Sequence, residues 1–277
     1  MSIGDNTRSN ITCNASINTY GYSFFPLKTY LDFIIQLSDE HGGRKPFIIS
    51  VTGSSDDVIE CYRQITATQN NVKMQLIMEI NLSCPNIPGR PPPAYDKVSL
   101  SQYVTALGFE QQSYIRESSE NKAVVPVSIK TPPYTYSDQF SVLITALRDA
   151  EKQTKICPIS YITATNTLGS TLVLSSPGED ESFAPACVSH DNSGIGGLAG
   201  APLHPIALGN VYELTKRLKQ HPYTENIQVL GVGGVSDADG YRRMRSVGAI
   251  AVEVGTALGL HGVGIFQHIA DGLEGNW

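Results

Sequence analysis

The stretch MQLIMEINLS (74–83) decides how the rest of the chain is interpreted. Its apolar residues run almost without a break and then give way to Asn81 and Ser83, directly before Cys84. A short, nearly continuous apolar run is typical of a strand buried on both faces of a parallel sheet. We therefore predict a strand here whose carboxyl end carries polar side chains.

Five further segments repeat this pattern and alternate with longer amphipathic segments. The predicted strands are PFIISVTG (46–53), VVPVSIK (124–130), ISYITATN (159–166), IQVLGVGG (227–234) and AIAVEVGT (249–256). The predicted helices are 27–38, 56–69, 98–117, 138–152, 205–219, 237–246 and 263–273. Buried strands that alternate with helices indicate an α/β protein with a parallel sheet.

Polar residues and glycines gather where these predicted strands end, which favours a (β/α)₈ TIM barrel over an open sheet with one switch point. We count only six strand–helix units, although closure of the barrel needs eight. Two units could be disguised in 84–123 and 167–226, or the chain could lack them, and we favour the second interpretation. We expect a polar segment at 1–15, which could be disordered, and a barrel domain incomplete at its N-terminal end at 16–277.

Composition excludes several classes of protein. The chain has 277 residues and a formal net charge of -6, and no basic cluster predicts a nucleic-acid partner. No apolar run reaches the length of a membrane span. Its five cysteines form no C-x-x-C pair, which fits neither a disulfide framework nor a metal site and indicates a cytoplasmic protein.

Cys84 follows a predicted strand end and opens a loop stiffened by prolines, NLSCPNIPGRPPPAYD (81–96). A thiol held there could act as a base or nucleophile if its surroundings adjust its pKa. Asn81 and Asn86 flank it, and their amides both donate and accept hydrogen bonds, as a planar heterocycle requires. The alternative is a half-buried loop cysteine between two turn-forming asparagines.

Three glycine segments follow predicted strands: SGIGGLAG (193–200), GVGG (231–234) and Gly255-Thr256. Glycines at strand ends let backbone N–H groups approach a phosphate, and barrel enzymes place such loops after their last two strands. We therefore expect a mononucleotide such as a flavin, although each segment could be only a tight turn. Lys130, at another strand end, would place positive charge beside an electron-rich ring or would simply be a solvated lysine.

Together these residues resemble the dihydroorotate dehydrogenase family, most closely its cytosolic, fumarate-reducing class. The cysteine loop NLSCPNIPGRPPPAYD carries most of the resemblance, which runs from about residue 16 to the end of the chain. Other matching segments, in the order of the family, are SINTYGYS (16–23), SIKTPPY (128–134), TNT (165–167), SGIGG (193–197), GVGG (231–234) and EVGTAL (253–258).

The resemblance implies FMN-dependent oxidation of (S)-dihydroorotate to orotate in de novo pyrimidine (UMP) biosynthesis, with fumarate as electron acceptor. It implies that Cys84 is the general base that removes the C5 proton while a hydride passes from C6 to the flavin. The implied substrate-binding residues are Asn18, Asn81, Asn86, Asn166 and Thr167. The implied FMN-binding residues are Lys130, Thr165, Gly197, Gly233, Gly234, Gly255 and Thr256.

The resemblance also implies a homodimer, without nucleic acid or membrane. Members of the family begin with two further barrel strands, which this chain is expected to lack, in agreement with the six units counted above. Two alternatives therefore stay open. One is a flavoprotein that acts on another dihydropyrimidine, such as dihydrouracil, and the other is a truncated, non-catalytic remnant of the family.

Overall fold

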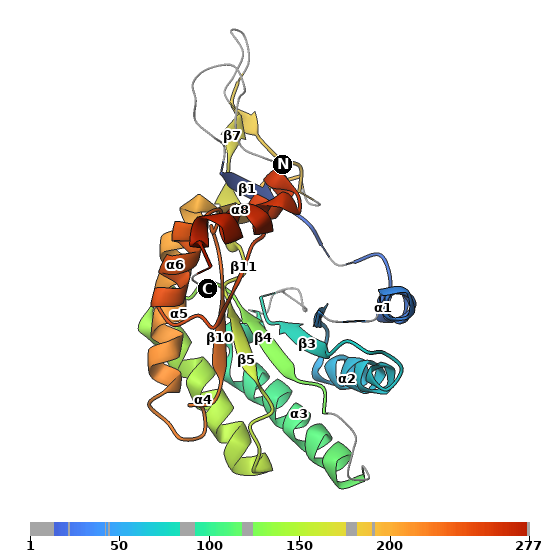
Figure 1. The fold of residues 1–277 in the computed structure, drawn as a ribbon. Coiled ribbons are helices and arrows are strands. Elements are labelled where there is room, and N and C mark those ends of the chain that lie inside the picture. Colours follow the sequence, from blue (N-terminus) through green and yellow to red (C-terminus); the bar gives the residue numbers. More distant parts are fainter. Residues whose placement is uncertain are drawn as a thin grey trace. The chain divides into compact units, whose positions relative to one another are not determined.

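The structure is a computed structural model that describes residues 14–21, 23–41, 43, 45–83, 92–117, 124–175, 182–189 and 192–275. The chain groups into two compact units (Figure 1). Unit 1 consists of Met1–Tyr22, Ala164–Thr215 and Val229–Trp277, and unit 2 consists of Ser23–Thr163 and Lys216–Gln228.

Parallel strands form the centre of unit 2. They are β2 (Phe47–Val51), β3 (Leu76–Asn81), β4 (Val127–Thr131) and β5 (Tyr161–Ala164, whose last residue belongs to unit 1). Their hydrogen-bonded order is β5-β4-β3-β2. Leu76, Met78 and Ile80 are at most 1% exposed, and Glu79 between them is 4% exposed. Both faces of β3 are thus buried, as its nearly continuous apolar sequence predicts.

Helices α1 (Leu27–His41), α2 (Ser55–Gln69), α3 (Lys97–Glu117) and α4 (Ser137–Thr154) complete unit 2, with a short 3₁₀ helix at Pro93–Tyr95. Helix α3 packs against both α2 and α4. Leu100 and Leu107 of α3 and Leu143 of α4 are fully buried, so apolar packing holds these helices in place.

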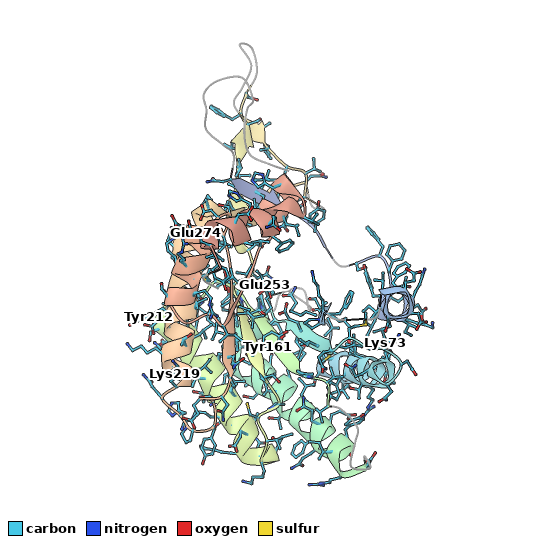
Figure 2. The ribbon with its side chains drawn as sticks, in the orientation of Figure 1. Lys73, Tyr161, Tyr212, Lys219, Glu253 and Glu274 are labelled. Atoms are coloured by element: carbon cyan, nitrogen blue, oxygen red, sulfur yellow. The ribbon has the colours of Figure 1, made fainter. Side chains whose placement is uncertain are left out.

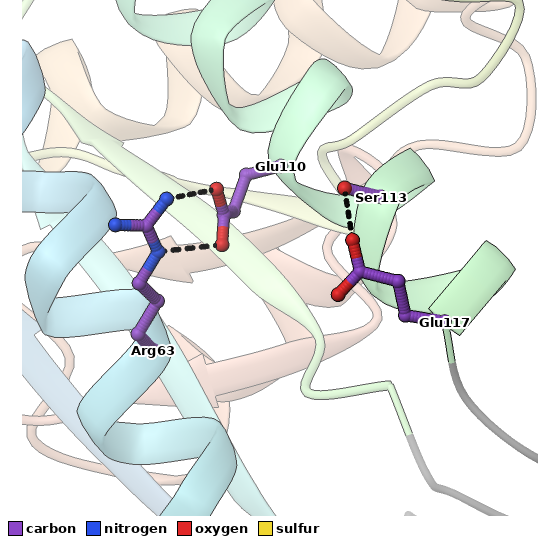
Figure 3. Close-up of polar contacts among 4 residues, drawn as sticks. All are labelled: Arg63, Glu110, Ser113 and Glu117. Carbon is purple, nitrogen blue, oxygen red and sulfur yellow. Dashed lines mark hydrogen bonds and ion pairs between the residues drawn. The ribbon is translucent and has the colours of Figure 1, made fainter.

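Polar groups fix the start of α2 and its contact with α3. The Ser54 hydroxyl accepts from Asp57 N, and the Asp57 carboxylate accepts from Ser54 N at 2.8 Å, which together form a capping box. Arg63 of α2 donates two hydrogen bonds, of 2.8 and 2.7 Å, to Glu110 of α3 (Figure 3). Because solvent screens an ion pair whose arginine is exposed, this pair orients the two helices more than it stabilises them.

Unit 1 contains the last parallel strands and their helices. They are β10 (Gln228–Val232), β11 (Ala251–Glu253), α5 (His204–Leu218), α6 (Ala238–Ser246), α7 (Thr256–His261) and α8 (Gly264–Leu273), with a 3₁₀ helix at Ala201–Leu203. The first residue of β10 and the last three of α5 belong to unit 2. Strands β10 and β11 pair in parallel, and α6 packs against α8.

Antiparallel strands make up the rest of unit 1. They are β1 (Ala15–Asn18), β6 (Leu168–Leu172), β7 (Leu174–Ser175), β8 (Ala184–Pro185) and β9 (Ile195–Gly200). Strand β9 lies between β1 and β6 and is antiparallel to both, while β7 pairs with β8. The glycine segment 193–200, which we interpreted as a loop or tight turn, is therefore mostly a strand, because pairing on both edges compensates for its missing side chains.

The predicted fold class is confirmed. All six predicted strands and all seven predicted helices form, each within a few residues of its expected ends. Within the described parts of 84–123 and 167–226 there is no further parallel strand–helix unit, as expected for a barrel that is incomplete. In the described ranges no helix is long and apolar enough to cross a membrane.

Candidate active site

The antiparallel strands of unit 1 bring three predicted site residues together. Asn18, at the end of β1, lies opposite Gly197 of β9 and donates a hydrogen bond of 3.3 Å from Nδ2 to Gly197 O. A Cβ atom on Gly197 would overlap Thr167 Oγ1, so only glycine fits there. Asn18 thus supplies an amide and Thr167 a hydroxyl beside Gly197, which has no side chain. This combination suits hydrogen bonding to a flat polar ring.

Thr165 and Asn166 follow β5 in the same unit. Thr165 N donates to Val232 O at 2.9 Å, which fixes this segment beside β10. Asn166 Oδ1 accepts from Thr167 N at 2.8 Å. The Thr165 side chain is 2% exposed, and its Oγ1 has no hydrogen-bond partner within the described residues. A buried hydroxyl of this kind is a candidate for contact with a bound molecule or water.

The turn after β10 requires its two glycines. Gly233 and Gly234 have φ angles of 138° and 71°, a region that side chains rarely adopt. A Cβ atom on Gly234 would also lie 2.7 Å from Gly200 O and 2.7 Å from His204 Cβ. The chain therefore approaches β9 and α5 more closely here than any other residue would allow.

A small pocket in unit 1 is lined by three of the predicted FMN-binding residues, Gly234, Gly255 and Thr256. The space inside it that a water-sized molecule can occupy is only about 30 Å³, and the rest of the hollow opens to solvent. The other lining residues are Asn14, Gly200, Ala201, Val235, Ser236, Ala257, Leu260 and His261. None of the lining residues is acidic, and Ser236, Thr256 and His261 can all donate hydrogen bonds. These groups fit a phosphate.

Three of the predicted FMN-binding residues of unit 1, Thr165, Gly197 and Gly233, lie outside the lining of this pocket. Gly197 belongs to the cluster with Asn18 and Thr167 described above. Gly233 precedes Gly234 in the turn, but its own Cβ position faces Ala207 of α5 at 2.6 Å. The roles of Gly197 and Gly233 in cofactor binding therefore stay predictions.

A buried histidine that holds the glycine turn was not predicted from the sequence. His204, the first residue of α5, is 8% exposed, and its Nδ1 lies 2.7 Å from Gly233 O. Arg243 Nε donates to His204 Nε2 at 3.1 Å. Because arginine can only donate, Nε2 must accept and Nδ1–H must donate to Gly233 O. A polar residue at the first position of a helix after a glycine strand is the only signal that could have pointed to it.

Ser16 is a second residue to which no role was assigned from the sequence, where it belongs only to the matching segment SINTYGYS (16–23). Its Oγ lies 2.7 Å from Thr256 Oγ1, so β1 contacts the first residue of α7 at the pocket. This hydrogen bond orients the hydroxyl that lines the pocket. Figure 2 shows the side chains around the strands of both units, with Tyr161 labelled at the start of β5 and Glu253 at the end of β11.

Unit 2 brings Asn81 and Lys130 together. They lie opposite each other at the ends of β3 and β4, and Leu82 N donates to Lys130 O at 3.2 Å. Asn81 Oδ1 accepts from Ser83 N at 3.1 Å, which shapes the turn that leaves the strand. The Lys130 side chain is half-buried among otherwise buried residues. An amide and an ammonium group thus lie next to each other at the carboxyl ends of two neighbouring strands, where polar residues were predicted.

The described residues on either side of Cys84, Leu82 and Ala94, are held close to each other in unit 2. Ala94 N donates to Leu82 O at 3.3 Å, and Tyr134 OH donates to Ala94 O at 3.1 Å. Burial of Tyr134 raises the pKa of its hydroxyl well above the ordinary value, so it stays a hydrogen-bond donor. The predicted base Cys84 and its neighbour Asn86 lie outside the described residues.

Three further cysteines lie within the described residues, Cys61, Cys157 and Cys187. Burial raises the pKa of the thiols of Cys61 on α2 and Cys157 before β5. Nearby carboxylates add to the effect, Asp57 and Glu60 for Cys61 and Glu151 for Cys157. Cys187 Sγ lies 3.1 Å from Gly194 O in unit 1. None of the three lies at the carboxyl end of a parallel strand.

The chain alternates parallel strands and helices, and it carries polar residues and glycine turns at the carboxyl ends of the strands. These features are typical of the class of barrel enzymes. The family model for dihydroorotate dehydrogenase matches residues 6–276. The chain therefore belongs to the dihydroorotate dehydrogenase family. The match begins about ten residues earlier than the motifs alone indicated.

Relatives of known name agree with this assignment. Dihydroorotate dehydrogenase A (fumarate) from Lactococcus lactis subsp. cremoris is 28% identical over 260 residues, which cover 94% of this chain and 73% of that protein. A relative from Streptococcus pyogenes serotype M3 is 30% identical over 262 residues, covering 94% of this chain and 72% of its own length.

A solved structure agrees with the fold. The crystal structure of DHODH from Eimeria tenella in complex with ferulenol superposes with a TM-score of 0.53 at 19% identity. The superposition covers 79% of this chain and 53% of that one. The chain thus spans about half the length of this structural neighbour and somewhat under three quarters of the relatives above.

Proposed function

We propose that the chain catalyses FMN-dependent oxidation of (S)-dihydroorotate to orotate, the oxidative step of de novo pyrimidine biosynthesis, with fumarate as electron acceptor. The observation that carries this proposal is the family match, over nearly the whole chain, to a family whose similar members are named for fumarate. We place the protein in the cytoplasm and expect a homodimer.

The pocket beside Gly234 and Gly255 supports FMN as the cofactor. Neither position carries a side chain of its own that would cover the backbone, and no acidic residue is among the residues that line the pocket. We assign Gly234, Gly255 and Thr256 to the phosphate, and Lys130 and Thr165 to the ring system. When bound, FMN would accept the hydride.

The remaining chemistry belongs to the chain. Cys84 would act as the general base that takes the C5 proton of the substrate, because the loop that carries it begins beside Asn81 at a strand end. Asn18, Asn166 and Thr167 in unit 1 and Asn81 and Asn86 in the loop region would hold the pyrimidine and its carboxylate by hydrogen bonds. Amides suit this task because they both donate and accept.

A spectroscopic titration followed by a turnover assay tests the proposal. FMN absorbance should change and saturate on addition of the protein, and dihydroorotate should then bleach the flavin, with fumarate restoring its colour. Cys84→Ala should bind FMN normally but lower the rate of dihydroorotate oxidation at least a hundredfold, as loss of a general base does.

Cys61→Ala is the matched control, because it removes a thiol from α2 rather than from a strand end. It should oxidise dihydroorotate at the wild-type rate. Equal activity in Cys84→Ala and wild type would disprove the role of Cys84, and a wild type that binds FMN but oxidises dihydrouracil in preference to dihydroorotate would identify a different dihydropyrimidine as substrate.

A further inference from the structure

A buried carboxyl group lies in the middle of the parallel strands of unit 2. Glu79 on β3 is 4% exposed and accepts a hydrogen bond of 2.6 Å at Oε2 from Thr163 Oγ1 on β5. Ser128 Oγ on β4 lies 3.4 Å from the same oxygen. Three neighbouring strands therefore meet at one carboxyl group.

Stability alone does not account for this group. Glu79 is itself almost fully buried, and within the described residues its carboxyl group is held by the hydroxyl groups of Thr163 and Ser128, which are fully buried. Among the described residues, no ion pair involves Glu79. Burying a carboxylate opposes folding, and apolar replacements for buried charges are often neutral or stabilising. A glutamate in this position therefore calls for a functional explanation.

The register of the strands places Glu79 directly below the candidate site. Glu79 pairs with Ser128, and two residues further on Asn81 pairs with Lys130. Because side chains alternate along a strand, Asn81 and Lys130 project from the same face as Glu79 and Ser128. Two residues of strand correspond to about 6.6 Å. The level of Glu79 and Ser128 therefore lies about this far along the strands from the level of Asn81 and Lys130.

We propose that Glu79 is a positioning residue for the cofactor, whose negative charge offsets that of Lys130 and lowers the electron affinity of FMN bound at the strand ends. The inference rests on the proposed function for the presence of FMN. In an interior of low dielectric, a charge two strand residues away interacts strongly with a group at the strand ends, because little water screens it. Lys130 favours added electron density on the flavin ring, and Glu79 limits that preference.

The test is the reduction potential of bound FMN in Glu79→Gln, measured by dye equilibration in the purified holoprotein. Glutamine keeps the shape and can still accept from Thr163, but it removes the negative charge. The potential should rise by about 30 mV, which is a tenfold shift toward reduced flavin for a two-electron couple. Affinity for oxidised FMN should change little.

Thr163→Val provides the matched control, because it removes the hydrogen bond of 2.6 Å without changing the charge. It should destabilise the chain and leave the potential where it is in wild type. An unchanged or lower potential in Glu79→Gln, or an equal rise in Thr163→Val, would overturn the inference.

The outcomes separate this inference from the proposed function. FMN binding with the expected shift but without dihydroorotate oxidation would contradict the proposed function alone. FMN binding and dihydroorotate oxidation with no shift in Glu79→Gln would contradict only the role of Glu79. A wild-type chain that binds no FMN would contradict both.

Discussion

The parallel strands of unit 2 and the antiparallel strands of unit 1 bury their residues very differently. Four of the six residues of β3 are buried, whereas β6 has none buried and β9 only its last residue. Yet Asn18 and Gly197 belong to the antiparallel sheet, and Thr167 directly precedes β6. The well-packed sheet supplies rigidity, and the thinly packed one supplies backbone and polar groups that can reach a ligand.

The largest effect expected from this contrast is on stability. Leu76→Ala on β3 should lower the free energy of unfolding by about 2–5 kcal/mol, because its side chain is fully buried. Leu172→Ala on β6, where the side chain is 50% exposed, should change it by about 0.5 kcal/mol or less. Urea unfolding followed by circular dichroism measures both, and similar losses would contradict the contrast.

A smaller effect should follow from filling the space at Gly197. Gly197→Ala should destabilise the chain by about 1–3 kcal/mol, because its methyl group would overlap the Thr167 side chain. Adding Thr167→Gly should relieve part of this loss, and a double-mutant cycle of unfolding free energies measures the coupling.

Gly169 on β6 offers the control for that experiment. Nothing lies within 4 Å of its Cβ position, so Gly169→Ala should be close to neutral. If Gly197→Ala proved as mild as Gly169→Ala, the close packing of Gly197 against Thr167 would be disproved.

The smallest expected effect is at the capping box of α2 in unit 2. Hydrogen bonds from the Ser54 side chain, and then from its backbone, lower the pKa of Asp57. A lowered pKa in the folded state means that this stabilisation is present at neutral pH and is lost as the pH falls through the folded pKa, below the ordinary value of 3.8.

Ser54→Ala should therefore lower the free energy of unfolding by about 1 kcal/mol at pH 7, because the helix loses its N-cap. The difference from wild type should shrink in acid, as the pH falls through the lowered pKa of Asp57 and the carboxyl group becomes protonated in both proteins. Denaturant unfolding at neutral and at acid pH measures it, and a difference that grows in acid would refute the assignment.

The parallel strands and their helices could be predicted because their pattern is local. Each apolar run in the sequence is itself the buried strand, and Asp237, predicted near the start of a helix, is the N-cap of α6. The polar strand ends at Asn81 and Lys130 followed from the same reasoning, since parallel strands present their carboxyl ends together.

The antiparallel strands could not be predicted, because their pairing joins distant segments. Strand β9 has three glycines in six residues and no apolar alternation, so it resembles a turn until β1 and β6 pair with it. The contact of His204 with Arg243 likewise connects two helices whose sequences carry no common motif. Glu79 did carry a signal, a charge within an apolar run, but the predicted site residues were those at the strand ends.

The hydrogen bond between Asn18 and Gly197 spans 179 residues of chain. During synthesis at about 5–20 residues per second, the segment that forms β1 waits on the order of 10–40 s before its partner has been translated. Throughout that interval the segment that forms β1 cannot make its native pairing with β9. Pairing of this early segment is therefore among the later steps that the growing chain can complete.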